Sequence, residues 1–225
     1  MSQPDWLNDD EALFALMKSE LYTAALCDVM DELGYRDQAM NERIRPIGPP
    51  CVAAGRAKTV LAVDVYELDN EHYKLEIESV DSIRPHEIVV ACTNGSRRTG
   101  FWGELLSTAA RARGGVGAVV DGLVRDTRKI VEMNFPVFAC GVKPVDSRGR
   151  SRVIDYDCPV ECGDVLVRPG DIVMADHDGI AVVPAAIAAD VVRLALERVR
   201  KESLSKKELQ VGAYLRDVYN RYGVL

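Results

Sequence analysis

Hydrophobic positions recur at helical spacing near the start of the chain and predict two helices there. The first runs from Glu11 to Leu21, with Asn8 or Asp9 as its N-cap. The second runs from Ala24 to Leu33, with Thr23 as its N-cap. One face of this second helix is apolar, at Ala25, Val29, Met30 and Leu33. The N-terminal helical part is therefore expected within residues 9–34.

The middle of the chain alternates between strand and helix patterns. Strand-like runs are at 51–63, 87–91, 116–120 and 136–139, and helical patterns are at 68–80, 103–113 and 126–134. From Val153 onward, short alternating strands follow, separated by turn sequences such as Gly163-Asp164 and Asp178-Gly179. The α/β core is thus expected within residues 51–183, and the order favours an α/β or α+β sandwich over a doubly wound sheet.

The C-terminal segment, residues 184–222, is rich in Ala, Leu, Arg, Glu and Lys, and predicts one long helix or two. Gly212 is the candidate break between them. No linker is long enough to separate domains, so we expect a single domain over residues 1–225.

Composition narrows the class of protein. The chain has 225 residues, of which 48% are hydrophobic and 28% charged, as in ordinary globular domains. A net charge of −7 argues against a nucleic-acid partner, which requires a basic face. No apolar run approaches the roughly 20 residues of a membrane helix, and the acidic N-terminus lacks the pattern of a secretory signal. We therefore expect a cytoplasmic protein without a membrane contact.

The six cysteines are scattered along the chain, mostly in apolar surroundings. We expect them to be buried thiols rather than disulfides or metal ligands. Cys158 and Cys162 are close in sequence, but no nearby histidine completes a zinc site. The glycine-rich loops that bind nucleotides and the GxSxG turn of serine hydrolases are also absent from the sequence.

The segment from Trp102 to Ile130 contains the most informative pattern. Here a predicted helix is followed by a buried strand and then by the charged pair Arg125-Asp126. Charged residues after such a strand lie where open α/β sheets bind their ligands. Arginine suits a carboxylate and aspartate suits Mg²⁺ or Mn²⁺, so the pair predicts a small anionic substrate on a divalent metal. Alternatively, Asp126 caps the next helix and Arg125 is solvated.

Several neighbouring residues are further candidates. The start of the preceding helix offers free backbone N–H groups for a carboxylate, at Gly103, Glu104, Leu105 and Leu106. Glu104 either orients metal-bound water or simply favours the helix dipole. The basic turn at Arg97-Arg98 either binds an anion or is solvated, and His177 is expected at the tip of a hairpin.

Three stretches of the chain resemble the RraA-like family: TAALCDVMDELG, GELLSTAARARGGVGAVVDGLVRD and GDIVMADHDGIAVVP. The similarity covers about residues 22 to 200. The family includes 4-hydroxy-4-methyl-2-oxoglutarate aldolases, which are class II pyruvate aldolases, and RraA regulators of ribonuclease E. The resemblance implies an α-β-β-α sandwich of the swivelling phosphohistidine-domain-like type with a C-terminal helix. It also implies homotrimers or homohexamers with sites between neighbouring subunits.

The resemblance also implies roles for individual residues. Asp126 would bind Mg²⁺ or Mn²⁺ alongside waters, and Arg125 would contact the carboxylate or keto oxygen of a 2-oxo acid. Gly103 to Leu106 would give backbone N–H groups to the same carboxylate, and Glu104 would lie near the metal-bound waters. Glu202, on the C-terminal helix, would contribute to the site of a neighbouring subunit.

The chain departs from the aldolase pattern at one position. The pattern continues with an acid three residues after the aspartate, whereas this chain has Lys129. Lys129 weakens metal binding by its charge or recruits a further anionic group of the substrate. The expected function is a metal-dependent aldolase or oxaloacetate decarboxylase acting through a pyruvate enolate. The alternatives are a regulator that binds ribonuclease E or another protein, and a lyase or hydratase for a sugar-acid-like substrate.

Overall fold

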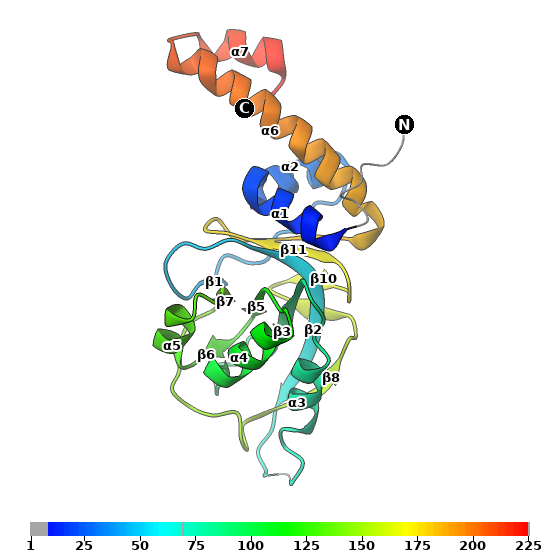
Figure 1. Cartoon of the computed structure of the whole chain (residues 1–225), viewed down its shortest axis with the longest axis vertical. Helices are drawn as coiled ribbons and strands as arrows, with labels where there is room; N and C mark the ends of the chain where they lie inside the picture. The colour runs from blue at the N-terminus through cyan, green and yellow to red at the C-terminus, as the bar shows by residue number, and fades with distance from the viewer. Residues whose placement is uncertain (1–8, 69, 225) are drawn as a thin grey trace.

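One curled, eight-stranded sheet organises the fold, and the computed structural model describes residues 9–68 and 70–224 of the chain (Figure 1). The helices are α1 (Asp10–Glu20), α2 (Thr23–Glu32), α3 (Lys74–Asp81), α4 (Glu104–Ala112), α5 (Thr127–Glu132), the short 3-10 helix η2 (Ala185–Ile187), α6 (Ala188–Gln210) and α7 (Leu215–Tyr222). The first eight strands are β1 (Arg45–Pro46), β2 (Ala53–Asp64), β3 (Glu87–Cys92), β4 (Gly100–Trp102), β5 (Gly117–Val120), β6 (Leu123–Val124), β7 (Val137–Ala139) and β8 (Ser151–Tyr156). The last four are β9 (Val160–Cys162), β10 (Val165–Val167), β11 (Ile172–Ala175) and β12 (Ile180–Val183). The mixed α/β class predicted from the sequence is confirmed.

The sheet has the strand order β1-β7-β5-β3-β2-β11-β12, with β8 paired to the far end of β2. Strands β2, β3, β5 and β7 are parallel, whereas β11 and β12 are antiparallel to their neighbours. Each parallel connection contains one helix, so α3, α4 and α5 cover the same outer face (Figure 1). The two other ladders, β9–β10 and β4–β6, lie outside this sheet.

Alternate residues of each strand face different layers of the molecule. In β3, Val89 and Ala91 pack beneath α3, α4 and α5, whereas Ile88 and Val90 face the opposite half of the curled sheet. In β11, Val173 faces that same interior, while its neighbours in the strand pack against α1, α2 and α6. The layers are therefore α-β-β-α, as the resemblance implies.

The N-terminal helices differ in how they are capped. Asp9 caps α1 as predicted, since its Oδ1 accepts the N–H of Glu11 at 2.9 Å. The prediction that Thr23 caps α2 is wrong, because Thr23 is the first helical residue. Its N–H and its hydroxyl each donate to the buried carboxylate of Asp176 at 2.8 Å. Asp176 lies between β11 and β12, so the turn around His177 anchors a helix.

Two further boundaries differ from the sequence pattern or decide between its alternatives. The helix predicted over 68–80 begins only at Lys74, and Leu68 remains exposed in the preceding loop. The C-terminal segment forms two helices, because Gly212 adopts a φ of +92° between α6 and α7. Figure 1 shows α6 extending away from the sheet, with α7 folded back against it.

All six cysteines are free thiols in the structure. Cys92 and Cys162 are buried and the other four are half-buried. Burial raises the pKa of the Cys92 thiol to about 11, so this group is protonated at neutral pH. Among the helices of the described residues, none has the length and apolar character needed to cross a membrane.

Candidate active site

The short ladder between β4 and β6 brings the predicted site residues together. The two strands are parallel, with Trp102 beside Val124, so both strands end on the same side of the ladder. The N–H of Arg125 donates to the carbonyl oxygen of Trp102 at 2.8 Å. The residues that directly follow the two strands therefore lie side by side: Gly103-Glu104 after β4 and Arg125-Asp126 after β6.

Gly103 leaves space for the side chains of Asp126 and Arg125. An ideal Cβ on Gly103 would lie 2.7 Å from Oδ2 of Asp126 and 3.2 Å from Cγ of Arg125. The first contact is closer than real Cβ atoms show and the second is tight, so a larger residue would displace the carboxylate. The close approach lets Asp126 accept the N–H of Glu104, the first residue of α4, at 3.3 Å.

Asp126 does not cap the helix that it precedes. Its backbone is left-handed, with φ 56° and ψ 28°, and its side chain makes no capping hydrogen bond to α5. The carboxylate instead faces the N-terminus of α4, where backbone N–H groups and the helix dipole favour a negative charge. A left-handed aspartate is uncommon, and here this conformation directs the side chain toward the candidate site.

The Arg125 guanidinium lies between two carboxylates. Its Nη1 is 3.2 Å from Oδ1 of Asp146, and its Nε is 3.7 Å from Oδ2 of Asp126. Asp146 also accepts the phenolic hydroxyl of Tyr73. About a third of the Arg125 side chain remains exposed, so part of the guanidinium faces solvent.

Glu104 and Lys129 form an ion pair beside this arrangement. Nζ of Lys129 donates to Oε2 of Glu104 at 2.8 Å, and this hydrogen bond raises the pKa of the Lys129 ammonium. The ammonium of Lys129 therefore neutralises the negative charge of Glu104, the acid predicted to lie near metal-bound water. Of the other predicted positions in the same turn, Leu105 is exposed and Leu106 packs against the core beneath α4.

Two predicted contributors lie elsewhere. Arg98 donates to the carbonyl oxygens of Val65 and Arg150, and thus has a structural role. Arg97 lines a separate polar pocket of about 690 Å³, whose wall also includes Arg43. The basic turn is therefore divided between two environments.

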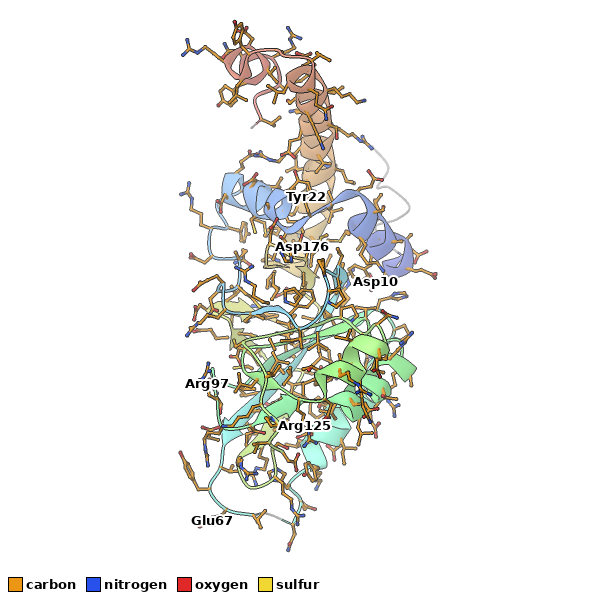
Figure 2. All side chains as sticks on the ribbon, turned by 90° about the vertical axis from the view of Figure 1, so that its left-hand side faces the viewer. Asp10, Tyr22, Glu67, Arg97, Arg125 and Asp176 are labelled. Atoms are coloured by element: carbon orange, nitrogen blue, oxygen red, sulfur yellow. The ribbon has the colours of Figure 1, made fainter. Side chains whose placement is uncertain are left out.

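Glu202 is not brought to these residues within one chain. It lies on α6, where it accepts hydrogen bonds from the hydroxyl of Tyr22 and from Nε of Arg198. Figure 2 shows Tyr22 in the helical part of the molecule and Arg125 well below it in the α/β part. The contribution of Glu202 to the site of a neighbouring subunit remains a prediction.

The sequence pattern did not identify three side chains that surround the Arg125 guanidinium on the side of α3. Tyr73 and Glu76 come from the start of α3, and Asp146 comes from the loop before β8. The three-residue spacing of Tyr73 and Glu76 in a predicted helix was the one pattern that linked them. Asp146 belongs to no recurring pattern, because its role depends on contacts between distant segments.

Burial changes the protonation of these groups. Desolvation, together with the nearby charge of Asp146, raises the pKa of Glu76 to about 7. Partial burial also raises the pKa of Asp146, but the hydrogen bond from Tyr73 and the charge of Arg125 lower it more, so that its net pKa is below the ordinary value. Of the two carboxylates that meet at the start of α3, Asp146 is therefore the one that ionises more readily.

The residues fit a divalent cation that keeps most of its water. Within residues 9–68 and 70–224, no group of three or more His, Cys, Asp or Glu side chains could hold a metal ion. The Asp126 carboxylate is 42% exposed, and a single exposed carboxylate suits hydrated Mg²⁺ better than a dehydrated transition metal. Asp126 would hold such an ion, with Glu104 next to its water shell.

Comparison with known proteins identifies the family of this chain. The sequence profile described as RraA-like, Aldolase/RraA, matches residues 23–182. A Halalkalibacterium halodurans protein provisionally named 4-hydroxy-4-methyl-2-oxoglutarate aldolase is 27% identical, with 86% of this chain and 89% of the relative covered. Legionella pneumophila protein DlpA is 28% identical over 84% of this chain, but this match spans only 31% of DlpA.

A solved structure shows the same fold. It is that of Streptomyces coelicolor RraAS2, described as an unusual member of the RNase ES inhibitor RraA protein family. The TM-score is 0.76 at 28% identity, with 92% of this chain and 98% of the other covered. The fold and the profile define a protein of the mixed α/β sandwich class. The chain belongs to the RraA-like family.

Proposed function

We propose that this protein is a divalent-metal-dependent lyase that cleaves a C–C bond of a 2-oxo acid, as an aldolase or as an oxaloacetate decarboxylase. The observation that supports this function is the approach of Arg125-Asp126 to Gly103-Glu104 at the end of the β4–β6 ladder. This arrangement combines a cation for a carboxylate, an oxygen ligand for Mg²⁺ or Mn²⁺, and a helix N-terminus.

The residues divide the work of such a reaction. Arg125 binds the carboxylate or keto oxygen of the substrate, and the first turn of α4 offers its free N–H groups to the same carboxylate. Asp126 would hold a divalent cation, which would supply positive charge to stabilise a negative keto oxygen. Glu104, which pairs with Lys129, accepts a proton directly or through water. Glu202 serves the site of a neighbouring subunit in a homotrimer or homohexamer.

Pyruvate release tests this proposal. Purified protein is incubated with 4-hydroxy-4-methyl-2-oxoglutarate or oxaloacetate, with Mg²⁺, with Mn²⁺ or with a chelator, and pyruvate is measured. We expect release that requires the metal and is lost in Asp126→Asn. Equal release by Asp126→Asn and the native protein would contradict the metal-binding role of Asp126.

A regulator that binds a protein partner is the second candidate. The similarity to RraAS2 and the pairing of Lys129 with Glu104, which lowers the negative charge available to a metal, favour it. Inhibition of ribonuclease E by the native protein, without pyruvate release from either substrate, would support this candidate.

A further inference from the structure

The loop before β8 holds the side chain of Arg125 from behind. Nη1 of Arg125 is 3.2 Å from Oδ1 of Asp146, which is closer than the 3.7 Å from its Nε to the adjacent Asp126. A free arginine side chain has many rotamers, and fixing one of them costs conformational entropy. An ion pair at Nη1 restricts that freedom before any substrate arrives.

Asp146 is itself fixed on its other side. Its Oδ2 accepts the hydroxyl of Tyr73 at 2.5 Å, while Oδ1 faces Arg125. The backbone of Ser147 and Arg148 also helps to lower the pKa of this carboxyl group. Tyr73 is the N-cap residue of α3, and its ring packs edge-on against that of the buried His72. The carboxylate is thus connected to a helix and is not a free surface group.

A second carboxyl group, that of Glu76, lies behind this ion pair. Glu76 lies one turn along α3 and is only 8% exposed, with the hydroxyl of Ser147 3.5 Å from its Oε2. Burial and the neighbouring Asp146 favour its neutral form. Asp146 is therefore the ionised carboxylate that orients Arg125 from this side.

We propose that Asp146, held by Tyr73, is a positioning residue that fixes the Arg125 guanidinium in the orientation that receives the substrate's carboxylate. The inference rests on the proposed function, because it assigns the exposed part of the guanidinium to a 2-oxo acid. Arginine has five N–H donors, so one edge can be held by Asp146 while the others remain for the substrate.

The sign of one substitution separates positioning from simple electrostatics. Asp146→Asn keeps the shape of the side chain but removes a negative charge near an anion site. If Asp146 acts only through its charge, this variant binds an anion more tightly. If it positions Arg125, the variant binds an anion more weakly, because the guanidinium is no longer held.

Oxalate, an anion that resembles a 2-oxo acid, is the probe in the presence of Mg²⁺. Calorimetry gives the dissociation constant Kd, and pyruvate release gives KM and kcat. We expect Asp146→Asn to raise Kd and KM about tenfold, with a smaller effect on kcat, and Tyr73→Phe to raise Kd about threefold. The double variant should bind like Asp146→Asn alone, since Tyr73 acts through Asp146.

The matched control is Asp10→Asn. Asp10 pairs with Arg56 at 2.7 Å with similar exposure, but it lies on α1, away from the site. We expect this variant to keep the native Kd and KM, while melting curves show that every variant is folded. An unchanged or lower Kd in folded Asp146→Asn overturns the positioning role. A native protein that neither binds oxalate nor releases pyruvate overturns the proposed function and, with it, this inference.

Discussion

Lys129 on α5 and Glu104 on α4 form an ion pair, with 2.8 Å between Nζ and Oε2. The lysine occupies the position where the aldolase pattern described above has an acid, and its ammonium is paired with the carboxylate of Glu104, whose backbone N–H donates to Asp126. The pair therefore sets how much negative charge a cation at Asp126 would meet.

Lys129→Met should strengthen the binding of Mg²⁺. The substitution removes a positive charge near Asp126 and frees Glu104, so we expect the Kd for Mg²⁺ to fall about threefold to tenfold by calorimetry. Lys74→Met is the control, because Lys74, on α3, is similarly exposed and pairs with Glu71 in the turn before that helix. An unchanged Kd in Lys129→Met would show that Glu104 does not act on the metal.

Gly103→Ala should reduce activity more than stability. Its added Cβ would lie 2.7 Å from the Asp126 carboxylate and would move it away from α4. We expect at least a roughly tenfold loss of kcat/KM for pyruvate release, because small displacements of catalytic groups are costly. Gly48→Ala has the same 2.7 Å conflict, but with a methyl group of Val131, and should lower the melting temperature without this loss.

Asp126→Asn and Asp126→Ala should differ in stability but not in metal binding. Both remove the charge that would hold a cation. Position 126 has a φ of 56°, which asparagine tolerates better than alanine. We therefore expect Asp126→Ala to unfold with about 1 kcal/mol less free energy than Asp126→Asn in urea titrations. Equal free energies would mean that the loop relaxes to another conformation.

Glu76 should make stability depend on pH. Burial raises its pKa from 4.5 to about 7 in the folded protein, so the folded state binds this proton more tightly than the unfolded state. Its contribution to stability is complete below about pH 4.5 and is lost as the pH rises to about 7. The difference corresponds to about 3 kcal/mol in the free energy of unfolding.

The Glu76→Gln variant measures this contribution. We expect its free energy of unfolding at pH 8 to exceed that of the native protein by up to about 3 kcal/mol, with little difference at pH 4.5. Glu78→Gln on the exposed face of the same helix should follow the native protein at both values. If the free energy of unfolding of Glu76→Gln changes with pH as that of the native protein does, the pH dependence arises from another group.

Local pattern predicts the part of the site that depends on short segments. The apolar run at 116–120 and the following Arg125-Asp126 were sufficient to place a charged pair beyond a buried strand. The three-residue strand β4 was not predicted, since it is too short to show periodicity. Its pairing with β6 is nevertheless what brings Gly103 beside Asp126.

Contacts between distant segments explain what the sequence could not show. Tyr73 and Asp146 are 73 residues apart, and their hydrogen bond depends on how α3 packs beside β8. Thr23 is a second example. It was expected to cap α2, but its N–H donates instead to Asp176, which is 153 residues further along the chain. In both cases a polar side chain satisfies a partner that only the folded chain brings near.

The capping of α4 by Asp126 makes one backbone proton a reporter of the site. The amide of Glu104 donates to Oδ2 of Asp126 at 3.3 Å. A cation that takes the lone pairs of Oδ2 weakens this hydrogen bond, so that the amide exchanges faster with deuterium. A cation at Oδ1 alone leaves the exchange rate unchanged. Hydrogen exchange at this single amide thus identifies the carboxylate oxygen that an added metal ion uses, even in the absence of turnover.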